Sequence, residues 1–301
     1  MSGTATHCGT VGLAGRPNVG KSTLLNRLVG QKLSITAHRP QTTRHVITGI
    51  KTTARAQFIF VDTPGLHPPR GRALNRVLAR VAQGALQQVD VLLVLFEAGR
   101  WIAEDDWVLE QVRVASGRCL AVLNKLDALK DRAALLPQMQ RLSASGLFEA
   151  VVPLSARRGE GLGALEQEIA TRLPEAAFMY EPDALTSASE RFLAAEIIRE
   201  KLTRRLGQEL PYALTVRIEK FEDLPGQARI LAGIVVEREG QKAIVIGAGG
   251  AMLKAVGSEA RQDMERLFGR RVHLELWVRV KKGWADDERA LRALGYGDDS
   301  G

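Results

Sequence analysis

The sequence has little of what a secreted or membrane-embedded protein needs. It contains 2 cysteines in 301 residues, Cys8 and Cys119, and they show no spacing typical of a disulfide framework or a zinc site. Its longest unbroken apolar run, VLLVLF at residues 91–96, is much shorter than the roughly 20 residues of a membrane-spanning helix. The N-terminus lacks the basic, apolar and small-residue succession of a secretory signal. We therefore expect a protein of the reducing cytoplasm.

Basic residues outnumber acidic ones only in the first part of the chain. The net charge of +8 divides into 22 basic against 13 acidic residues in 1–174 and 20 against 21 in 175–301. Within the second part, residues 254–282 are locally basic, with 8 basic and 4 acidic residues. This distribution is only weak evidence for a polyanionic partner such as nucleic acid.

The arrangement of apolar patterns changes near residue 174. Before it, short strand-like runs alternate with helical patterns, which predicts an α/β domain with a mostly parallel sheet and helices on both faces. Residues 175–189 form a polar, proline-containing linker, and residues 190–301 predict a second, α+β domain. The elements expected in the second domain are helix 190–206, strands 212–221, 228–238 and 242–247, helix 251–267, strand 271–280 and helix 286–294.

The stretch GRPNVGKS at residues 15–22 fits the phosphate-loop pattern G-x-x-x-x-G-K-[ST], between a predicted strand and a predicted helix. Its glycines let backbone N–H groups turn inward around phosphates, Lys21 supplies a cation for the β- and γ-phosphate oxygens, and the Ser22 hydroxyl is suited to Mg²⁺. We expect nucleotide contacts from Gly15, Arg16, Pro17, Asn18, Val19, Gly20, Lys21, Ser22 and Thr23.

Three stretches at the ends of later predicted strands indicate which base is bound. In DTPG, residues 62–65, Asp62 is placed to hold Mg²⁺ through water, and the Gly65 N–H to contact a γ-phosphate. In NKLD, residues 124–127, Asp127 can accept hydrogen bonds from guanine N1–H and the 2-amino group, neither of which adenine offers. In SA, the Ala156 N–H can meet guanine O6. These elements predict a GTP site, with further contacts from Asn124, Lys125, Asp127, Ser155 and Ala156.

The order of these elements resembles that of the translation-factor-related small GTPases. The stretch ITAHRPQTTRHVITG at residues 35–49 looks like their switch I, in which Thr43, or alternatively Thr42, joins Mg²⁺ when a γ-phosphate is present. We therefore expect the catalytic groups to be Lys21, Thr43 and Gly65, and the Mg²⁺ site to comprise Ser22, Thr43 and Asp62.

Hydrolysis is expected to be slow. The residue after DTPG is Leu66, where Ras-like enzymes carry the glutamine that orients water, and a leucine side chain cannot hydrogen-bond a nucleophile. In some GTPases with a hydrophobic residue there, an asparagine of the phosphate loop helps to hold a potassium ion. Asn18 occupies that position, so it either serves a K⁺ site or only shapes the loop.

A second glycine-rich stretch, GAGG at residues 247–250, does not fit a nucleotide cradle. A dinucleotide fingerprint requires glycine where Met252 stands, and a phosphate loop requires lysine where Ala251 stands. The remaining G-x-x-G pattern, after the strand predicted at 242–247 and before a helix, fits either a bare helix entry or a KH domain. In KH domains such a loop clamps about four nucleotides of single-stranded RNA.

Over essentially all 301 residues, these motifs and the C-terminal stretch VHLELWVRVKKGWADDERALRALGY resemble the bacterial Era-type GTPases. The resemblance implies a P-loop GTPase domain at 1–174, a linker at 175–189 and a prokaryotic-type (type II) KH domain at 190–301. It implies binding of GTP or GDP with Mg²⁺, and binding of the 3′ end of 16S ribosomal RNA during assembly of the 30S subunit. It also implies a cytoplasmic protein, sometimes peripheral to the inner membrane, and we expect a monomer.

One departure from that family concerns the GAGG loop, within which many relatives carry a lysine or an asparagine. Phosphate contacts are then left to the loop backbone and nearby cations, and we expect RNA contacts from Gly247, Ala248, Gly249, Gly250, Lys254, Arg270 and Lys281. The alternative function is a GTP-regulated protein- or membrane-binding module without RNA contact, which the near-neutral charge of residues 175–301 favours.

Overall fold

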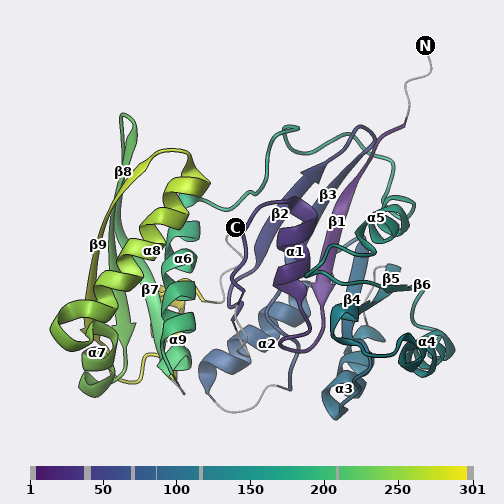
Figure 1. The fold of residues 1–301 in the computed structure, drawn as a ribbon, viewed down its shortest axis with the longest axis horizontal. Coiled ribbons are helices and arrows are strands. Elements are labelled where there is room, and N and C mark those ends of the chain that lie inside the picture. Colours follow the sequence, from purple (N-terminus) through teal and green to yellow (C-terminus); the bar gives the residue numbers. More distant parts are fainter. Residues whose placement is uncertain are drawn as a thin grey trace.

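Two separate β-sheets organise the molecule, one in each part of the chain (Figure 1). The computed structural model describes residues 5–36, 42–68, 72–85, 87–114, 118–207 and 210–296. A six-stranded sheet lies in the N-terminal domain, a name we use for β1 to α5, and a three-stranded sheet lies in the C-terminal domain, α6 to α9.

The N-terminal domain alternates strands and helices. Its elements are β1 (His7–Ala14), α1 (Lys21–Val29), β2 (Ile47–Thr52), β3 (Ala56–Asp62), α2 (Ala73–Ala85), β4 (Val91–Glu97), α3 (Ala103–Val112), β5 (Arg118–Asn124), α4 (Leu135–Ala144), β6 (Ala150–Pro153) and α5 (Leu162–Ala170). The strand order is β2-β3-β1-β4-β5-β6, and all neighbours are parallel except the antiparallel pair β2 and β3. The predicted mostly parallel sheet is confirmed. Strand β1 has β3 on one side and β4 on the other, so the order of the strands reverses direction at β1. A binding crevice is expected at the carboxyl end of the strands at such a point.

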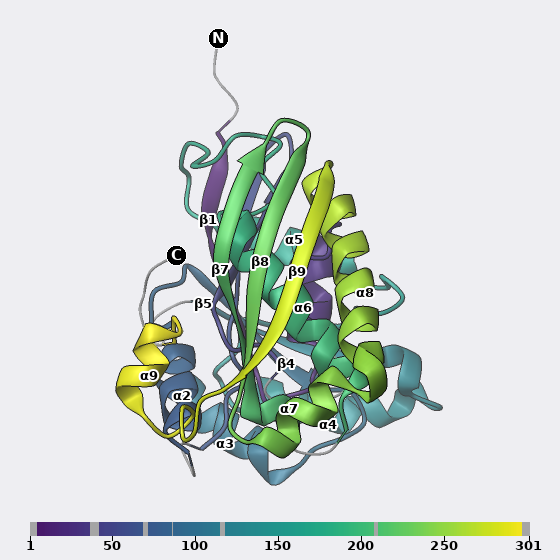
Figure 2. The same ribbon diagram turned by 90° about the vertical axis from the view of Figure 1, so that its left-hand side faces the viewer.

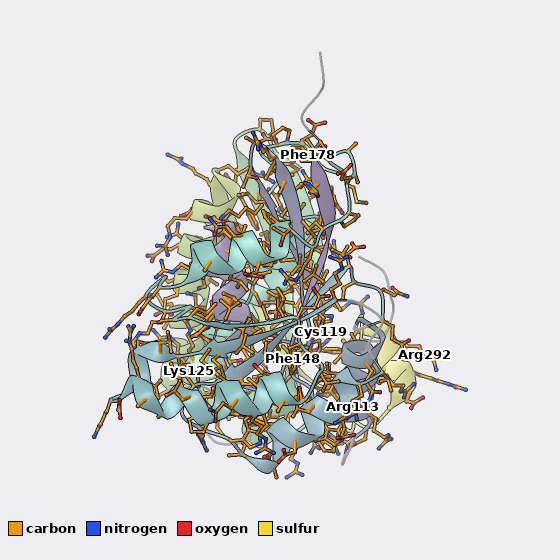
Figure 3. The ribbon with its side chains drawn as sticks, turned by 90° about the vertical axis from the view of Figure 1, so that its right-hand side faces the viewer. Arg113, Cys119, Lys125, Phe148, Phe178 and Arg292 are labelled. Carbon is orange, nitrogen blue, oxygen red and sulfur yellow. The ribbon has the colours of Figure 1, made fainter. Side chains whose placement is uncertain are left out.

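Helices cover both faces of this sheet, as its all-apolar central strands require. Helices α1 and α5 bury their leucines on one face, among them Leu24, Leu28 and Leu165. Helices α2, α3 and α4 cover the other face, where Cys119 lies in the apolar cluster and Phe148 packs against that cluster (Figure 3). The expectation of helices on both faces is therefore confirmed.

The segment between the two domains is bonded to the edge of the N-terminal sheet. The N–H of Ile50 donates to the carbonyl of Leu185 at 2.8 Å, and the Gln57 side-chain amide donates to the carbonyl of Tyr180 at 2.8 Å. The Thr186 hydroxyl donates to the carbonyl of Thr48. The predicted linker thus bonds to backbone groups of β2 and to the Gln57 side chain of β3.

The C-terminal domain is an α+β unit with helices on one face of a small sheet (Figure 2). Its elements are α6 (Glu190–Arg205), β7 (Leu214–Leu224), β8 (Gln227–Val236), α7 (Glu239–Ile246), α8 (Ala251–Phe268), β9 (Arg271–Val280) and α9 (Glu288–Ala293). Strand β8 lies between β7, its antiparallel partner, and β9, its parallel partner. Helices α6 and α8 bury apolar residues against the sheet, among them Ile198, Leu202 and Met264.

The strand predicted at 242–247 is wrong, because these residues form most of helix α7. An apolar run this short does not distinguish a buried helix from a strand. The tertiary arrangement decides: β8 and β9 are parallel, so the chain between them must cross over the sheet, and α7 and α8 make that crossover. The side chain of Gln241 caps the start of α7 by accepting from the N–H groups of Glu237 and Arg238.

The end of the chain returns to the N-terminal domain. Helix α9 lies beside α2 (Figures 1 and 2), where Trp284, Leu291 and Tyr296 share a buried cluster with Leu74 and Leu78. The C-terminal domain thus packs on α2, the next helix along the chain after the DTPG segment. Among the described helices no single one is long and apolar enough to cross a membrane; only α7 together with the segment through α8, bent by 44°, passes that test of length and composition.

Candidate nucleotide-binding site

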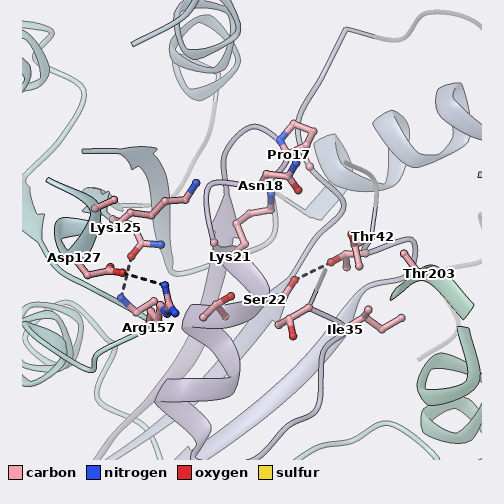
Figure 4. A pocket seen from close by; sticks show the side chains of 18 of the residues that line it. Pro17, Asn18, Lys21, Ser22, Ile35, Thr42, Lys125, Asp127, Arg157 and Thr203 are labelled. Atoms are coloured by element: carbon pink, nitrogen blue, oxygen red, sulfur yellow. Dashed lines mark hydrogen bonds and ion pairs between the residues drawn. The ribbon is translucent and has the colours of Figure 1, made fainter. Parts of the chain in front are cut away.

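A cleft of about 680 Å³ opens at the carboxyl ends of β1, β3, β5 and β6. Its volume lies in the range of small-ligand sites. In Figure 4, Lys125, Asp127 and Arg157 lie at one end, Ser22, Ile35, Thr42 and Thr203 at the other, and Lys21 between them. The predicted residues that line it are Pro17, Asn18, Gly20, Lys21, Ser22, Thr23, Thr43, Gly65, Asn124, Lys125, Asp127 and Ala156.

The phosphate loop ends at the N-terminus of α1, where backbone N–H groups and the helix dipole favour an anion. The Lys21 ammonium folds back into the loop and donates to the carbonyls of Gly15 at 3.0 Å and Arg16 at 3.2 Å. Burial lowers the pKa of Lys21 to about 8. A bound phosphate would place a negatively charged partner beside this buried ammonium, which bonds two carbonyl oxygens.

Three glycines of the site are required by close contacts within the protein. A Cβ on Gly15 would lie 2.5 Å from the carbonyl oxygen of Leu95, and one on Gly65 would lie 2.9 Å from Pro17. A Cβ on Gly20, whose φ is 104°, would collide with the side-chain amide of Asn124. No side chain larger than a hydrogen atom therefore fits at these three positions without displacing a neighbouring residue.

Oxygen ligands gather around Asp62 at the end of β3. Its Oδ2 accepts hydrogen bonds from the hydroxyls of Ser22 at 2.7 Å and Ser34 at 2.6 Å, and lies 3.5 Å from the hydroxyl of Thr43. Its Oδ1 is buried and has no hydrogen-bond partner among the described residues. Burial raises the pKa of this carboxyl, and Lys21 and the hydroxyls offset that only in part. A hard cation with oxygen ligands fits this arrangement, so the residues present suit Mg²⁺.

The structure distinguishes the two threonines of the expected switch. The Thr43 hydroxyl lies 2.9 Å from the Ser22 hydroxyl, whereas the Thr42 carbonyl accepts from Arg199 of the C-terminal domain. The Thr43 hydroxyl therefore lies close to Ser22 and Asp62, the other two residues of the expected Mg²⁺ site. Residues 37–41 of the expected switch lie outside the described residues.

The base end of the cleft is held by a network centred on Asn124. Its amide donates to the carbonyl of Val19 at 2.8 Å, and its oxygen accepts from the N–H of Ala156 at 3.0 Å. The Ser155 hydroxyl donates to Asp127 at 2.6 Å, which orients that carboxylate. Lys125 adopts φ 72° and ion-pairs with Glu97 at 3.2 Å, so its stem lies along the cleft wall.

Five predicted nucleotide contacts lie behind the cleft wall and do not line it. The Arg16 guanidinium is buried and bonded to Asp105 at 3.0 Å and Glu97 at 2.8 Å, so only its backbone faces the loop interior. Ser155 acts through Asp127, which lines the cleft. The five are Gly15, Arg16, Val19, Asp62 and Ser155.

Two residues, one bonded to the phosphate loop and one to Asp62, have structural roles that sequence reasoning missed. Leu66 is 1% exposed and belongs to the apolar cluster under α2, α3 and α4. It is therefore a core residue, in addition to having a side chain that cannot hydrogen-bond water. Ser34 holds the Asp62 carboxylate. No spacing signal marked Ser34, because it acts through a fold contact across 28 positions.

The GAGG loop lies between α7 and α8, away from the nucleotide cleft. Gly247, Gly249 and Gly250 have φ values of 74°, 56° and 79°. A Cβ on Gly249 or Gly250 would meet no atom of the described residues within 4 Å, whereas one on Gly247 would lie 2.7 Å from Met252. The outer face of the loop is therefore open.

Of the predicted RNA-contacting cations, the structure brings only some near the loop. Lys254 is exposed on the first turn of α8, and Lys281 is exposed just after β9, where β8 leads into α7. Arg270 lies beyond the opposite end of α8 and binds Glu190 with both guanidinium nitrogens, one at 3.0 Å. Arg270 is thus placed to tie β9 to α6 and is remote from the loop.

Comparisons with known proteins agree with both domains. Residues 10–125 match the family of 50S ribosome-binding GTPases, and residues 209–285 match the KH domain family. The GTPase Era of Stenotrophomonas maltophilia (strain R551-3) is 54% identical over 293 residues, 97% of this chain and 98% of that protein. The GTPase Era of Pseudomonas entomophila (strain L48) is 52% identical over 295 residues, 98% of each chain.

Solved structures agree with the same assignment. Era in complex with MgGDPNP and nucleotides 1506–1542 of 16S ribosomal RNA is similar with a TM-score of 0.93 at 34% identity, over 97% of this chain and 100% of that one. A variant of Aquifex aeolicus Era bound to GDP and AlF₄⁻ is similar to the same extent. The chain therefore belongs to the Era family of GTPases.

Proposed function

We propose that this protein is a GTP-hydrolysing switch that binds the 3′ end of 16S ribosomal RNA through residues 190–301 and acts in assembly of the small ribosomal subunit. The observation that carries the RNA assignment is the GAGG loop: positive φ angles turn it between two helices, and its outer face meets no described atom within 4 Å at Gly249 and Gly250. The Era structure that contains nucleotides 1506–1542 matches this chain over both domains.

We propose the following roles in GTP hydrolysis for the residues of the cleft. Lys21 and the N–H of Gly65 would neutralise charge on the γ-phosphate oxygens, and Asp127 would accept from the guanine edge. Ser22, Thr43 and Asp62 would hold Mg²⁺, which neutralises phosphate charge when bound. Since Leu66 is buried in the core, none of its atoms can orient the attacking water, and slow turnover follows.

RNA binding by the loop is tested with Gly250→Asp, which adds bulk and negative charge where RNA phosphates would lie. The matched control is Gly226→Asp in the turn between β7 and β8, because Gly226 also has positive φ, 70°, and open space. Binding of a short single-stranded RNA with the 16S 3′-end sequence should fall at least tenfold in G250D, and its salt dependence should flatten. The G226D protein and GTP binding in both variants should be unaffected.

Full RNA affinity in the folded G250D protein would contradict the proposal. The second candidate, a GTP-regulated protein- or membrane-binding module, would then lead, since residues 175–301 have almost no net charge.

We also propose that Asn18 helps to hold a potassium ion that assists hydrolysis. Asn18 lines the cleft with φ 64°, a conformation that its role in shaping the loop would also require. A glycine adopts that φ without strain, so Asn18→Gly removes the side chain and keeps the loop. Turnover should be faster in K⁺ than in Na⁺, and the substitution should abolish the difference; equal rates of the parent protein in both salts exclude the role.

The remaining proposals concern where the protein acts. We propose a cytoplasmic monomer that associates with the 30S subunit and in part with the inner membrane, and domain limits at 1–174, 175–189 and 190–301. The basic excess of residues 1–174 supports contact with polyanionic surfaces. Cofractionation with 30S particles and with membranes, and the mass of the purified protein in solution, test these points.

A further inference from the structure

Helix α6 of the C-terminal domain reaches the nucleotide cleft of the other domain. Thr203 and Arg204 are among the residues that line the cleft, and Figure 4 shows Thr203 at its switch end. Sequence reasoning could not find these residues, because nothing in a predicted KH helix indicates a nucleotide site that lies far earlier in the chain.

Two arginines of α6 bond to the expected switch I on either side of residues 37–41. The Arg204 guanidinium donates to the carbonyl of Thr36 at 3.0 and 3.1 Å and to its hydroxyl at 3.1 Å. The Arg199 guanidinium donates to the carbonyl of Thr42 at 2.5 Å. Because residues 199 and 204 are five apart, their bonds reach two points of the segment from adjacent turns of one helix.

These arginines are themselves held in place by buried carboxylates. Glu196, 4% exposed, pairs with Arg199. Glu200, 1% exposed, pairs with Arg204 at 2.8 Å and with Lys32 of the N-terminal domain at 2.5 Å. A buried charge that is fully paired fixes geometry, because every displacement leaves a charge without a partner. Arg199 and Arg204 are thus each paired with a buried carboxylate while they bond the switch segment.

The gripped segment contains the threonine that faces the Mg²⁺ position. Thr43 lies between two residues bound by the C-terminal domain: Thr42 by Arg199, and Arg44, which donates to the carbonyls of Leu214 at 2.8 Å and Pro211 at 2.7 Å. With these neighbours held, the Thr43 hydroxyl lies beside Ser22 and Asp62. That is the placement expected when a γ-phosphate is bound.

We propose that Arg199 and Arg204 are positioning residues for the GTPase site: the docked C-terminal domain holds switch I so that Thr43 is ready for Mg²⁺, and thereby favours the triphosphate over the diphosphate. A conformation that presents the Thr43 hydroxyl binds a ligand that uses this hydroxyl more tightly than one that does not. Reciprocally, a triphosphate stabilises docking of α6 on the N-terminal domain. The proposal requires nucleotide binding only and is independent of RNA.

The test compares Arg204→Ala with Arg205→Ala in the full-length protein. Arg205 is the next residue of α6 but pairs with Glu259 of its own domain, so it is a matched control. Affinities for GDPNP and GDP are measured at saturating Mg²⁺. Losing charge-assisted hydrogen bonds to Thr36 should lower the affinity for GDPNP about tenfold relative to that for GDP, and R205A should keep the parent ratio.

A second variant removes the other grip without leaving a buried unpaired charge. Glu196→Gln with Arg199→Met should lower the ratio of GDPNP to GDP affinity in the same direction and raise the Mg²⁺ concentration needed to slow GDPNP release. The proposal is overturned if R204A and the double variant keep the parent ratio, if both nucleotides weaken equally, or if R205A changes the ratio as much.

Discussion

The two glycine loops of this protein use the same residue for opposite purposes. In the phosphate loop and its neighbour DTPG, Gly15, Gly20 and Gly65 are needed because other parts of the protein press against them. In the GAGG loop, Gly249 and Gly250 adopt positive φ beside open space. The first site is closed by the protein itself, and the second leaves room for something that the chain does not supply.

This difference separates a preorganised site from a docking surface. Around the nucleotide cleft, Asn124, Asp62 and Arg16 are buried and bonded to other residues of the protein. By contrast, Lys254 on the first turn of α8, next to the GAGG loop, is exposed, and so is Lys281 just after β9. Substitutions at the first site should therefore cost both binding and stability, whereas substitutions at the second should affect little besides binding of its ligand.

The largest expected effect follows from the single side chain that would read the base. Asp127→Asn replaces an acceptor by an amide that cannot satisfy both guanine donors, so GTP should bind more weakly by about 3 kcal/mol, more than a hundredfold. Xanthosine triphosphate, which has a carbonyl in place of the 2-amino group, should bind this variant better than it binds the parent. Titration with fluorescent nucleotides measures both, and an unchanged affinity for GTP would show that Asp127 does not read the base.

Gly20→Ala tests whether the phosphate loop is as tightly built as its contacts indicate. The added methyl group meets the Asn124 amide, which bridges Val19 and Ala156, and φ 104° is unfavourable for alanine. We expect a loss of about 3 kcal/mol in the free energy of unfolding and little nucleotide binding.

Gly30→Ala at the other end of α1 is the control, since Gly30 has φ 81° but no described atom within 4 Å of a Cβ. Urea denaturation of both proteins gives the comparison. Equal losses would mean that backbone strain, and not the contact with Asn124, makes Gly20 necessary.

Leu66→Ala separates folding from catalysis next to the phosphates. Truncating a leucine that is 1% exposed leaves a cavity and should lower the free energy of unfolding by about 3 kcal/mol. The rate of GTP hydrolysis per folded molecule should change only slightly, because the side chain offers no hydrogen bond to lose. A large fall in turnover with intact stability and GTP binding would give Leu66 a catalytic role.

The smallest effect is expected for Gly250→Ala. Only the positive φ opposes the methyl group, so unfolding should become easier by about 1 kcal/mol and GTP affinity should be unchanged. A loss as large as that of G20A would show that the GAGG loop is also packed from within, and the contrast between the two loops would fail.

The sequence alone determined those features that depend on local patterns. Each of the four motifs (the phosphate loop, DTPG, NKLD and SA) lies at the carboxyl end of a strand. Because parallel strands bring their carboxyl ends to one edge of the sheet, the order of motifs and strands along the chain was enough to predict a common site. The helix predicted after the phosphate loop is also present, as α1, and it begins directly after Gly20 of that loop.

Only the tertiary structure decided what depends on distant partners. Residues 242–246 form a helix because β8 and β9 are parallel and need a crossover, which no short local pattern can specify. Arg270 was predicted to meet RNA from its charge, but charge does not reveal a partner such as Glu190, 80 positions away. Likewise, α6 reaches Thr36 and Thr42 through bonds that span more than 150 positions, because packing of two separately folded sheets sets which surfaces meet.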